Sequence, residues 1–134
     1  MTLASRRGLP GAALVLVLAA ARASACGHCI EDRIAVVYDY GVEQQARRAG
    51  LEIAYLGIDG ATADGEKIRD VLAAEPAIDR GTVRIAADPP AAAFAWDPRQ
   101  TALAGLLGRL NGRLATTGAK LVVLKTWNAQ RGLH

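Results

Sequence analysis

Two strand signals and a helix signal follow one another in VRIAADPPAAAFAWDPRQTALAGLLGRL, Val83–Leu110. Alternating apolar residues predict strands over Val83–Ala87 and Ala91–Asp97, on either side of a proline turn. The leucines that follow recur every three or four residues and predict an amphipathic helix, with Thr101 as its N-cap and Gly118 as its end. This apolar stripe consists of Leu103, Leu106, Leu107, Leu110 and Leu114.

The segments on both sides extend the same pattern. LEIAYLGI, Leu51–Ile58, and KLVVLKTW, Lys120–Trp127, predict two more strands, and Glu66–Glu75 predicts a short helix. The order β-α-β-β-α-β is typical of the ferredoxin-like arrangement, an antiparallel four-stranded sheet with two helices on one face. We therefore expect one α+β domain over residues 51–127 and an irregular tail over residues 128–134. The inward-facing residues of the sheet should lie at or next to Ile53, Val83, Phe94 and Val123.

The first 25 residues have the composition of an export signal. A basic pair, Arg6-Arg7, precedes the apolar stretch Leu9–Ala21 and the small-residue site Ala23-Ser24-Ala25, which is the order found in secretory signal peptides. The apolar stretch is shorter than the roughly 20 residues that span a bilayer. We expect cleavage after Ala25 and a periplasmic or secreted protein with no membrane span. An alternative is a lipid anchor at Cys26, because ASAC resembles a lipoprotein cleavage site.

Removal of this signal changes the charge of the protein. The full chain has 16 basic and 13 acidic residues, and loss of Arg6, Arg7 and Arg22 leaves 13 of each. A neutral chain lacks the basic surface that nucleic-acid binding requires. No serine follows Ser24, so serine triads are excluded, and neither a GxGxxG nor a Walker pattern is present. These observations favour a protein that is not an enzyme.

The only two cysteines of the chain lie in CGHC, Cys26–Cys29, at the expected start of the mature protein. The residues that follow have helical periodicity and predict one extra helix over about Cys29–Ala49, with CGHC at its N-terminus, in a segment bounded by residues 26–50. A helix N-terminus lowers the pKa of a thiol, and the resulting thiolate attacks disulfides or binds a soft metal ion. A disulfide across two residues closes too small a loop to stabilise the fold appreciably.

Redox chemistry is one interpretation of this motif. CGHC is typical of the active sites of protein disulfide isomerases, which belong to the thioredoxin fold. That fold has the motif directly after a strand and a cis-proline facing the cysteines, and here only Pro89 or Pro90 is a candidate for this proline. A thiol-disulfide redox protein is therefore the alternative function.

Metal binding is the other interpretation. Two thiolates, Cys26 and Cys29, suit Cu(I), whereas a closed zinc site requires four ligands. Cleavage after Ala25 would also free the Cys26 amine. Together with two backbone amides and the His28 imidazole, this amine forms a square-planar set for Cu(II) or Ni(II). The predicted metal ligands are therefore Cys26, His28 and Cys29.

CGHCIEDRI resembles the metal-binding loop and first helix of the heavy-metal-associated domains, the copper-chaperone family, and Val83–Leu110 resembles their second half. The resemblance implies a ferredoxin-like fold and transfer of Cu(I), or a similar soft ion, to a partner metal-transport protein, with Cys26 and Cys29 as ligands. In that family the CxxC follows the first strand, but Gly57–Gly65 contains no cysteine, and the usual methionine before the motif is absent. Either the CGHC helix is the family's first helix, with an insertion after it, or the cysteines have a different position. A third interpretation is an interaction module in which the cysteines are incidental.

Overall fold

The structure is a computed structural model, and it describes residues 29–60, 64–130 and 132–133. The expected signal peptide, Cys26 and His28 lie outside these ranges. None of the helices in the described ranges is long and apolar enough to cross a membrane. In chain order the elements are α2 (Ile30–Ala35), α3 (Tyr40–Ala49), β1 (Glu52–Gly60), α4 (Gly65–Ala73), β2 (Ile78–Ala87), β3 (Pro90–Trp96), α5 (Leu103–Leu114), a 3₁₀ turn (Ala115–Thr117), β4 (Ala119–Asn128) and β5 (Gly132–Leu133).

The strands form one antiparallel sheet in the order β2-β3-β1-β4-β5. The central strand β1 pairs with β3 on one side and with β4 on the other. The predicted α+β class, the predicted antiparallel sheet and the element order from β1 to β4 are thus confirmed. The prediction of an irregular tail was wrong, because β5 pairs with Trp127 and Asn128 at the end of β4.

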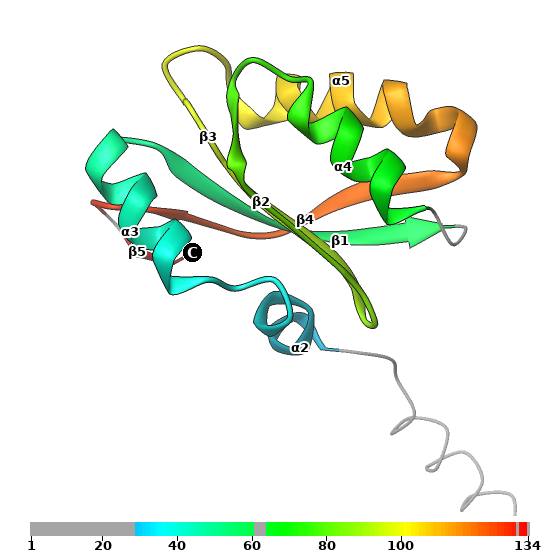
Figure 1. The fold of residues 1–134 in the computed structure, drawn as a ribbon, viewed down its shortest axis with the longest axis horizontal. Helices are drawn as coiled ribbons and strands as arrows, with labels where there is room; N and C mark the ends of the chain where they lie inside the picture. Colours follow the sequence, from blue (N-terminus) through cyan, green and yellow to red (C-terminus); the bar gives the residue numbers. More distant parts are fainter. Residues whose placement is uncertain (1–28, 61–63, 131, 134) are drawn as a thin grey trace, which may run out of the picture.

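One face of the sheet is covered by α4 and α5 (Figure 1). The leucine stripe of α5 is directed at the sheet as predicted: Leu106, Leu110 and Leu114 are buried, and Leu103 and Leu107 pack against them. Val83 and Phe94 lie in the same core. Ile53 itself faces the opposite side, but its immediate neighbour Ala54 lies in this core, as the prediction allowed. The prediction at Val123 was wrong, because Val123 is 37% exposed and Leu121, two positions earlier, lies in the core instead.

The opposite face is covered by α2 and α3 (Figure 1). Here Ile53, Tyr55 and Trp127 of the sheet pack against buried residues of the two helices and the linker between them. Every residue from Ile53 to Ile58 is consequently buried, since β1 is covered on both faces. The residues of the second core that come from the helices, the linker and β3 are Ile34, Val37, Val42, Ala46, Ala91, Ala93 and Ala95.

The predicted single helix over Cys29–Ala49 was wrong, because the chain breaks it into α2 and α3. Asp39 between them has extended backbone dihedrals, and its Oδ1 accepts the Gly41 N–H at 2.8 Å and the Val42 N–H at 3.4 Å. An aspartate at this position caps the first turn of a new helix. The break lets each short helix direct its own apolar residues at the sheet.

The predicted ends of α5 differ from those in the structure. The N-cap is Ala102 rather than Thr101, and Ala102 makes no side-chain capping hydrogen bond. α5 ends at Leu114, and Gly118 instead ends the 3₁₀ turn that follows it, in the left-handed conformation at φ 80°. The opposing Gly60, at φ 101°, has no room for a side chain, because a Cβ there would collide with the Gly118 carbonyl. These two glycines bring the end of β1 close to the start of β4.

Candidate site at Cys29 and helix α2

Of the three predicted metal ligands, only Cys29 lies in the described part of the chain. It precedes α2 as its N-cap, with an extended backbone, and its side chain makes no capping hydrogen bond. The residue is exposed. Because Cys26 and His28 lie outside the described residues, the three predicted ligands stay a prediction as a set.

Helix α2 is attached to the sheet by one apolar residue and one long basic side chain. Ile34 is buried in the second core. The Arg33 guanidinium lies across two strands: its Nη2 is 3.3 Å from Asp59 Oδ1, 3.2 Å from the Pro90 carbonyl oxygen and 3.5 Å from the Ile58 carbonyl oxygen. Its side chain is 20% exposed, whereas that of Asp59 is 56% exposed. Arg33 therefore joins α2 to β1 and to the start of β3.

Gly57 has no side chain, and the Arg33 guanidinium occupies the space in which one would lie. A Cβ at Gly57 would collide with the guanidinium group. The backbone of Gly57 lies in β1 without a left-handed φ, and the atoms that a Cβ would meet belong to the far end of the flexible Arg33 side chain, so a side chain here would displace the guanidinium. The sequence gives a weak signal for this contact, a lone glycine inside a strand.

Cys29 and α2 precede the first strand of the sheet. The helix that follows β1 is α4, and α2 lies on the other face of the sheet. The described residues between Gly57 and Gly65 contain no cysteine. The resemblance of the cysteine segment to heavy-metal-associated domains stays a prediction.

The surface next to α2 is apolar in part and acidic in part. Among the described residues, four of the six large exposed apolar side chains belong to the segment from Ile30 to Tyr40. Tyr38 donates a hydrogen bond of 2.8 Å to Glu43 Oε2, and this contact raises the pKa of the Tyr38 phenol. Burial raises the pKa of Tyr55, which stays neutral at physiological pH. Neither phenol is thereby prepared for acid–base chemistry.

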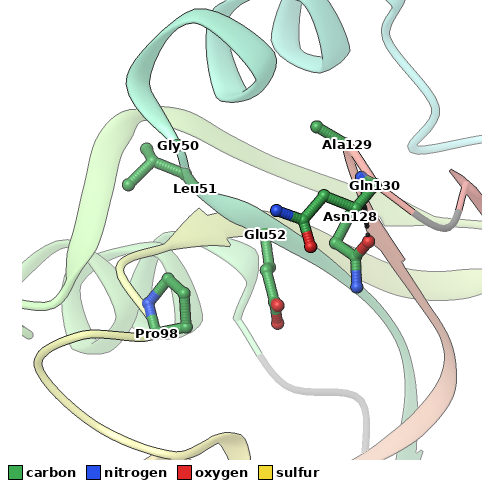
Figure 2. Close-up of a pocket in the computed structure, with 7 residues that line it drawn as sticks. All are labelled: Gly50, Leu51, Glu52, Pro98, Asn128, Ala129 and Gln130. Carbon is green, nitrogen blue, oxygen red and sulfur yellow. Dashed lines mark hydrogen bonds between the residues drawn. The ribbon is translucent and has the colours of Figure 1, made fainter.

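A pocket of about 180 Å³ lies at the other end of β1 (Figure 2). Its polar groups are the carboxylate of Glu52 and the amides of Asn128 and Gln130, and the Gln130 N–H donates to Asn128 Oδ1 at 3.1 Å. Glu52 and Asp59 lie at opposite ends of β1, about 20 Å apart in an extended strand. Oxygen and amide groups favour hard cations over soft ones.

A more open pocket of about 310 Å³ lies at the start of α4, lined in part by Asp64, Glu66 and Arg69. Two of these polar side chains have partners within the protein. Asp64 Oδ1 accepts the Glu66 N–H at 3.0 Å, and Arg69 of α4 donates to the Val83 carbonyl of β2 at 3.4 Å. Within the described ranges, no group of three or more His, Cys, Asp or Glu side chains could hold a metal ion.

Sequence reasoning missed the role of Arg33. Its position four residues after Cys29 was compatible with a solvent-exposed helix face, and only the packing of α2 on the sheet brings it to Asp59, which is 26 positions away. No family, no curated protein and no solved structure matches the chain when it is compared with known proteins.

Proposed function

We propose that the protein is an exported carrier or sensor of a soft metal ion, first of all Cu(I), which Cys26 and Cys29 bind as cargo. The observation that supports this most is the exposed Cys29 at the start of a helix that is anchored to the sheet. Thiolates are the ligands that select Cu(I) in proteins. A ligand as exposed as Cys29 lets the thiols of a partner replace the two cysteines one at a time, so that the ion passes between proteins without being released.

The fold that we propose for residues 51–127 is ferredoxin-like. The supporting observations are the element order from β1 to β4 and the strand order β2-β3-β1-β4, with α4 and α5 on one face. Copper-chaperone domains use this fold, although here the cysteines precede the first strand. We further propose a periplasmic or secreted location, reached through a signal peptide that is cleaved after Ala25, and a metal-transport protein as the partner.

Competition with a chromophoric Cu(I) chelator tests the proposal on the processed protein. We expect one Cu(I) per chain, and we expect the Cys26→Ser and Cys29→Ser variants to lose this binding because one thiolate remains. The matched control is His28→Ala, which keeps both thiols and should bind Cu(I) as the wild type does. Wild-type protein that does not compete with the chelator, or serine variants that compete equally well, would contradict the proposal.

A thiol-disulfide redox function is the second candidate, and one contact favours it. The proline turn that the thioredoxin comparison singled out lies against α2, because the Pro90 carbonyl accepts a hydrogen bond from Arg33 at 3.2 Å. The insulin-reduction assay separates the two functions. Turnover well above that of a free dithiol would favour redox chemistry, whereas stoichiometric Cu(I) binding without turnover favours the carrier.

The role of His28 is tested separately, through the proposed free amine of Cys26. Ni(II) replaces Cu(II) here, because thiols reduce Cu(II). The amine, two amides and the His28 imidazole form a square-planar site only while His28 is third in the chain. One extra residue before Cys26 should therefore weaken Ni(II) binding strongly and leave Cu(I) binding unchanged. Equal Ni(II) affinity of the extended and processed proteins would remove His28 from the set of ligands.

A further inference from the structure

The Arg33 side chain makes more contacts than an ordinary surface ion pair. An exposed pair of charges contributes little to stability. Here, however, the guanidinium also reaches two backbone carbonyls, one on β1 and one at the start of β3, and its side chain is only 20% exposed. All three acceptors contact one nitrogen, Nη2, and share its two N–H groups, and because they come from two strands they limit the orientations of the guanidinium.

This anchor lies one helical turn from Cys29. The Arg33 N–H donates to the Cys29 carbonyl at 3.2 Å, so the backbone of Cys29 and the anchored residue belong to the same turn. Helix α2 has only six residues, and Ile34 is its one buried residue. A helix this short is marginal without tertiary contacts. The contacts of Arg33 and the burial of Ile34 are the tertiary contacts that attach this turn to the sheet.

We propose that Arg33 is a positioning residue that fixes Cys29 relative to β1 and β3. This inference rests on the proposed function where it concerns the metal, because it gives Cys29 a constant place from which to bind and release the ion. The geometric part stands on the contacts of Arg33 alone. Gly57 contributes to this arrangement, because the absence of a side chain there makes room for the guanidinium.

The geometric part is tested by a nitroxide label on Cys29 in the processed protein that carries Cys26→Ser, read by electron paramagnetic resonance. In this background we expect Arg33→Ala to sharpen the spectrum markedly, Arg33→Lys to have a smaller effect, and Gly57→Ala to act like Arg33→Ala by displacing the guanidinium. The control is Arg80→Ala, which removes the same charge from an exposed position on β2. Unchanged circular dichroism verifies that each variant folds.

Spectra that are the same in Arg33→Ala, Gly57→Ala and the parent would overturn the positioning role. The metal part uses the protein with both cysteines. There we expect Arg33→Ala to weaken Cu(I) binding by about tenfold, the equivalent of roughly one charge-assisted hydrogen bond, and Arg33→Lys to recover part of it. If the wild type does not bind Cu(I), the proposed function is wrong. The spectra of the labelled protein would then still test whether Arg33 positions Cys29. Cu(I) binding that is equal in wild type and Arg33→Ala would overturn the metal part of the inference.

Discussion

The Arg33 guanidinium occupies the space in which a side chain at position 57 would lie. The effect of Gly57→Ala on the free energy of unfolding should therefore change sign when Arg33 is replaced by alanine. In the wild type, Gly57→Ala forces the guanidinium away and should lower the free energy of unfolding by about 1 kcal/mol, because the Arg33 hydrogen bonds are lost. In the Arg33→Ala background the same substitution should raise it by about 0.5 kcal/mol, since alanine restricts the unfolded chain more than glycine does. Urea unfolding of the four proteins measures both values. Additive effects would contradict the contact.

A second prediction about a single residue concerns Thr82. It is fully buried; its hydroxyl donates to the Asp79 carbonyl at 2.6 Å and accepts the Ala95 N–H at 2.8 Å. Thr82→Val keeps the shape but leaves a buried N–H unpaired, so it should lower the free energy of unfolding by about 2 kcal/mol. Thr82→Ser keeps the hydroxyl and loses one methyl group, at a cost of about 1 kcal/mol. A valine variant more stable than the serine variant would show that the hydroxyl is not needed.

At the scale of the element, the start of α3 responds to pH through Asp39. The ion pair with Arg84, 3.0 Å long, and the capping N–H groups hold the pKa of the Asp39 carboxyl below its ordinary value of 3.8. A lowered folded-state pKa gives stability that is present above the ordinary pKa and is lost as the pH falls through the folded-state value. The Asp39 contribution should therefore disappear at acidic pH, below about 4.

The test compares urea midpoints from neutral to acidic pH. Asp39→Asn keeps a good N-cap but removes the charge, so we expect a lower midpoint at neutral pH and a flatter decline in acid than in the wild type. The control is Asp70→Asn, which alters an exposed carboxylate of α4. An acid profile of Asp39→Asn that is parallel to that of the wild type would contradict the role of the ion pair.

The elements differ in how well the sequence predicts them, and the reasons are physical. The leucine period of α5 and the strand signals after it are local patterns, and they were correct. The break between α2 and α3 lies at Asp39, whose Oδ1 caps α3 while its Oδ2 accepts a hydrogen bond from Arg84 of β2, 45 positions away. An aspartate inside a helical pattern is a signal for such a break, but the apolar period continues across it.

The second covered face of the sheet also had a signal in the sequence. IAYLGI, Ile53–Ile58, and Ala91–Trp96 are nearly continuous apolar runs, and all of their residues are buried. Such runs indicate a strand that is covered on both faces, whereas an alternating pattern indicates one covered face. The alternation of Leu51, Ile53 and Tyr55 is real, but it describes only the face that packs on α2 and α3.

At the scale of the whole molecule, the sequence identifies the two thiols of the candidate site but does not place Cys29 on the fold. The CGHC motif contains the only two cysteines in the chain, and the chemistry predicted for them stays a prediction. The place of Cys29 relative to the sheet depends on contacts between residues far apart in sequence, such as Arg33 with Asp59 and Pro90. The periodicity of α2 does not predict these contacts of Arg33, so they are seen only in the folded chain.

The two cores share β1, and this predicts that α3 contributes to the stability of the entire molecule. Ala46 is fully buried in the second core, whereas Ala49, on the same helix, is exposed. Ala46→Asp would bury an unpaired carboxylate and should lower the global free energy of unfolding by about 3 kcal/mol. Ala49→Asp places the same charge in water near the helix C-terminus, where the cost is at most about 1 kcal/mol.

Tryptophan fluorescence and circular dichroism during urea unfolding distinguish a shared core from a separate attachment. Trp96 lies in the core under α4 and α5, and Trp127 lies in the core under α2 and α3. If the cores unfold together, Ala46→Asp shifts one common transition for both probes. If α2 and α3 are only attached to a stable sheet, the variant would lose part of its helical signal while the main transition stays at the wild-type midpoint. We expect the common shift, because removing α3 would expose both Ile53 and Tyr55 of the central strand to water.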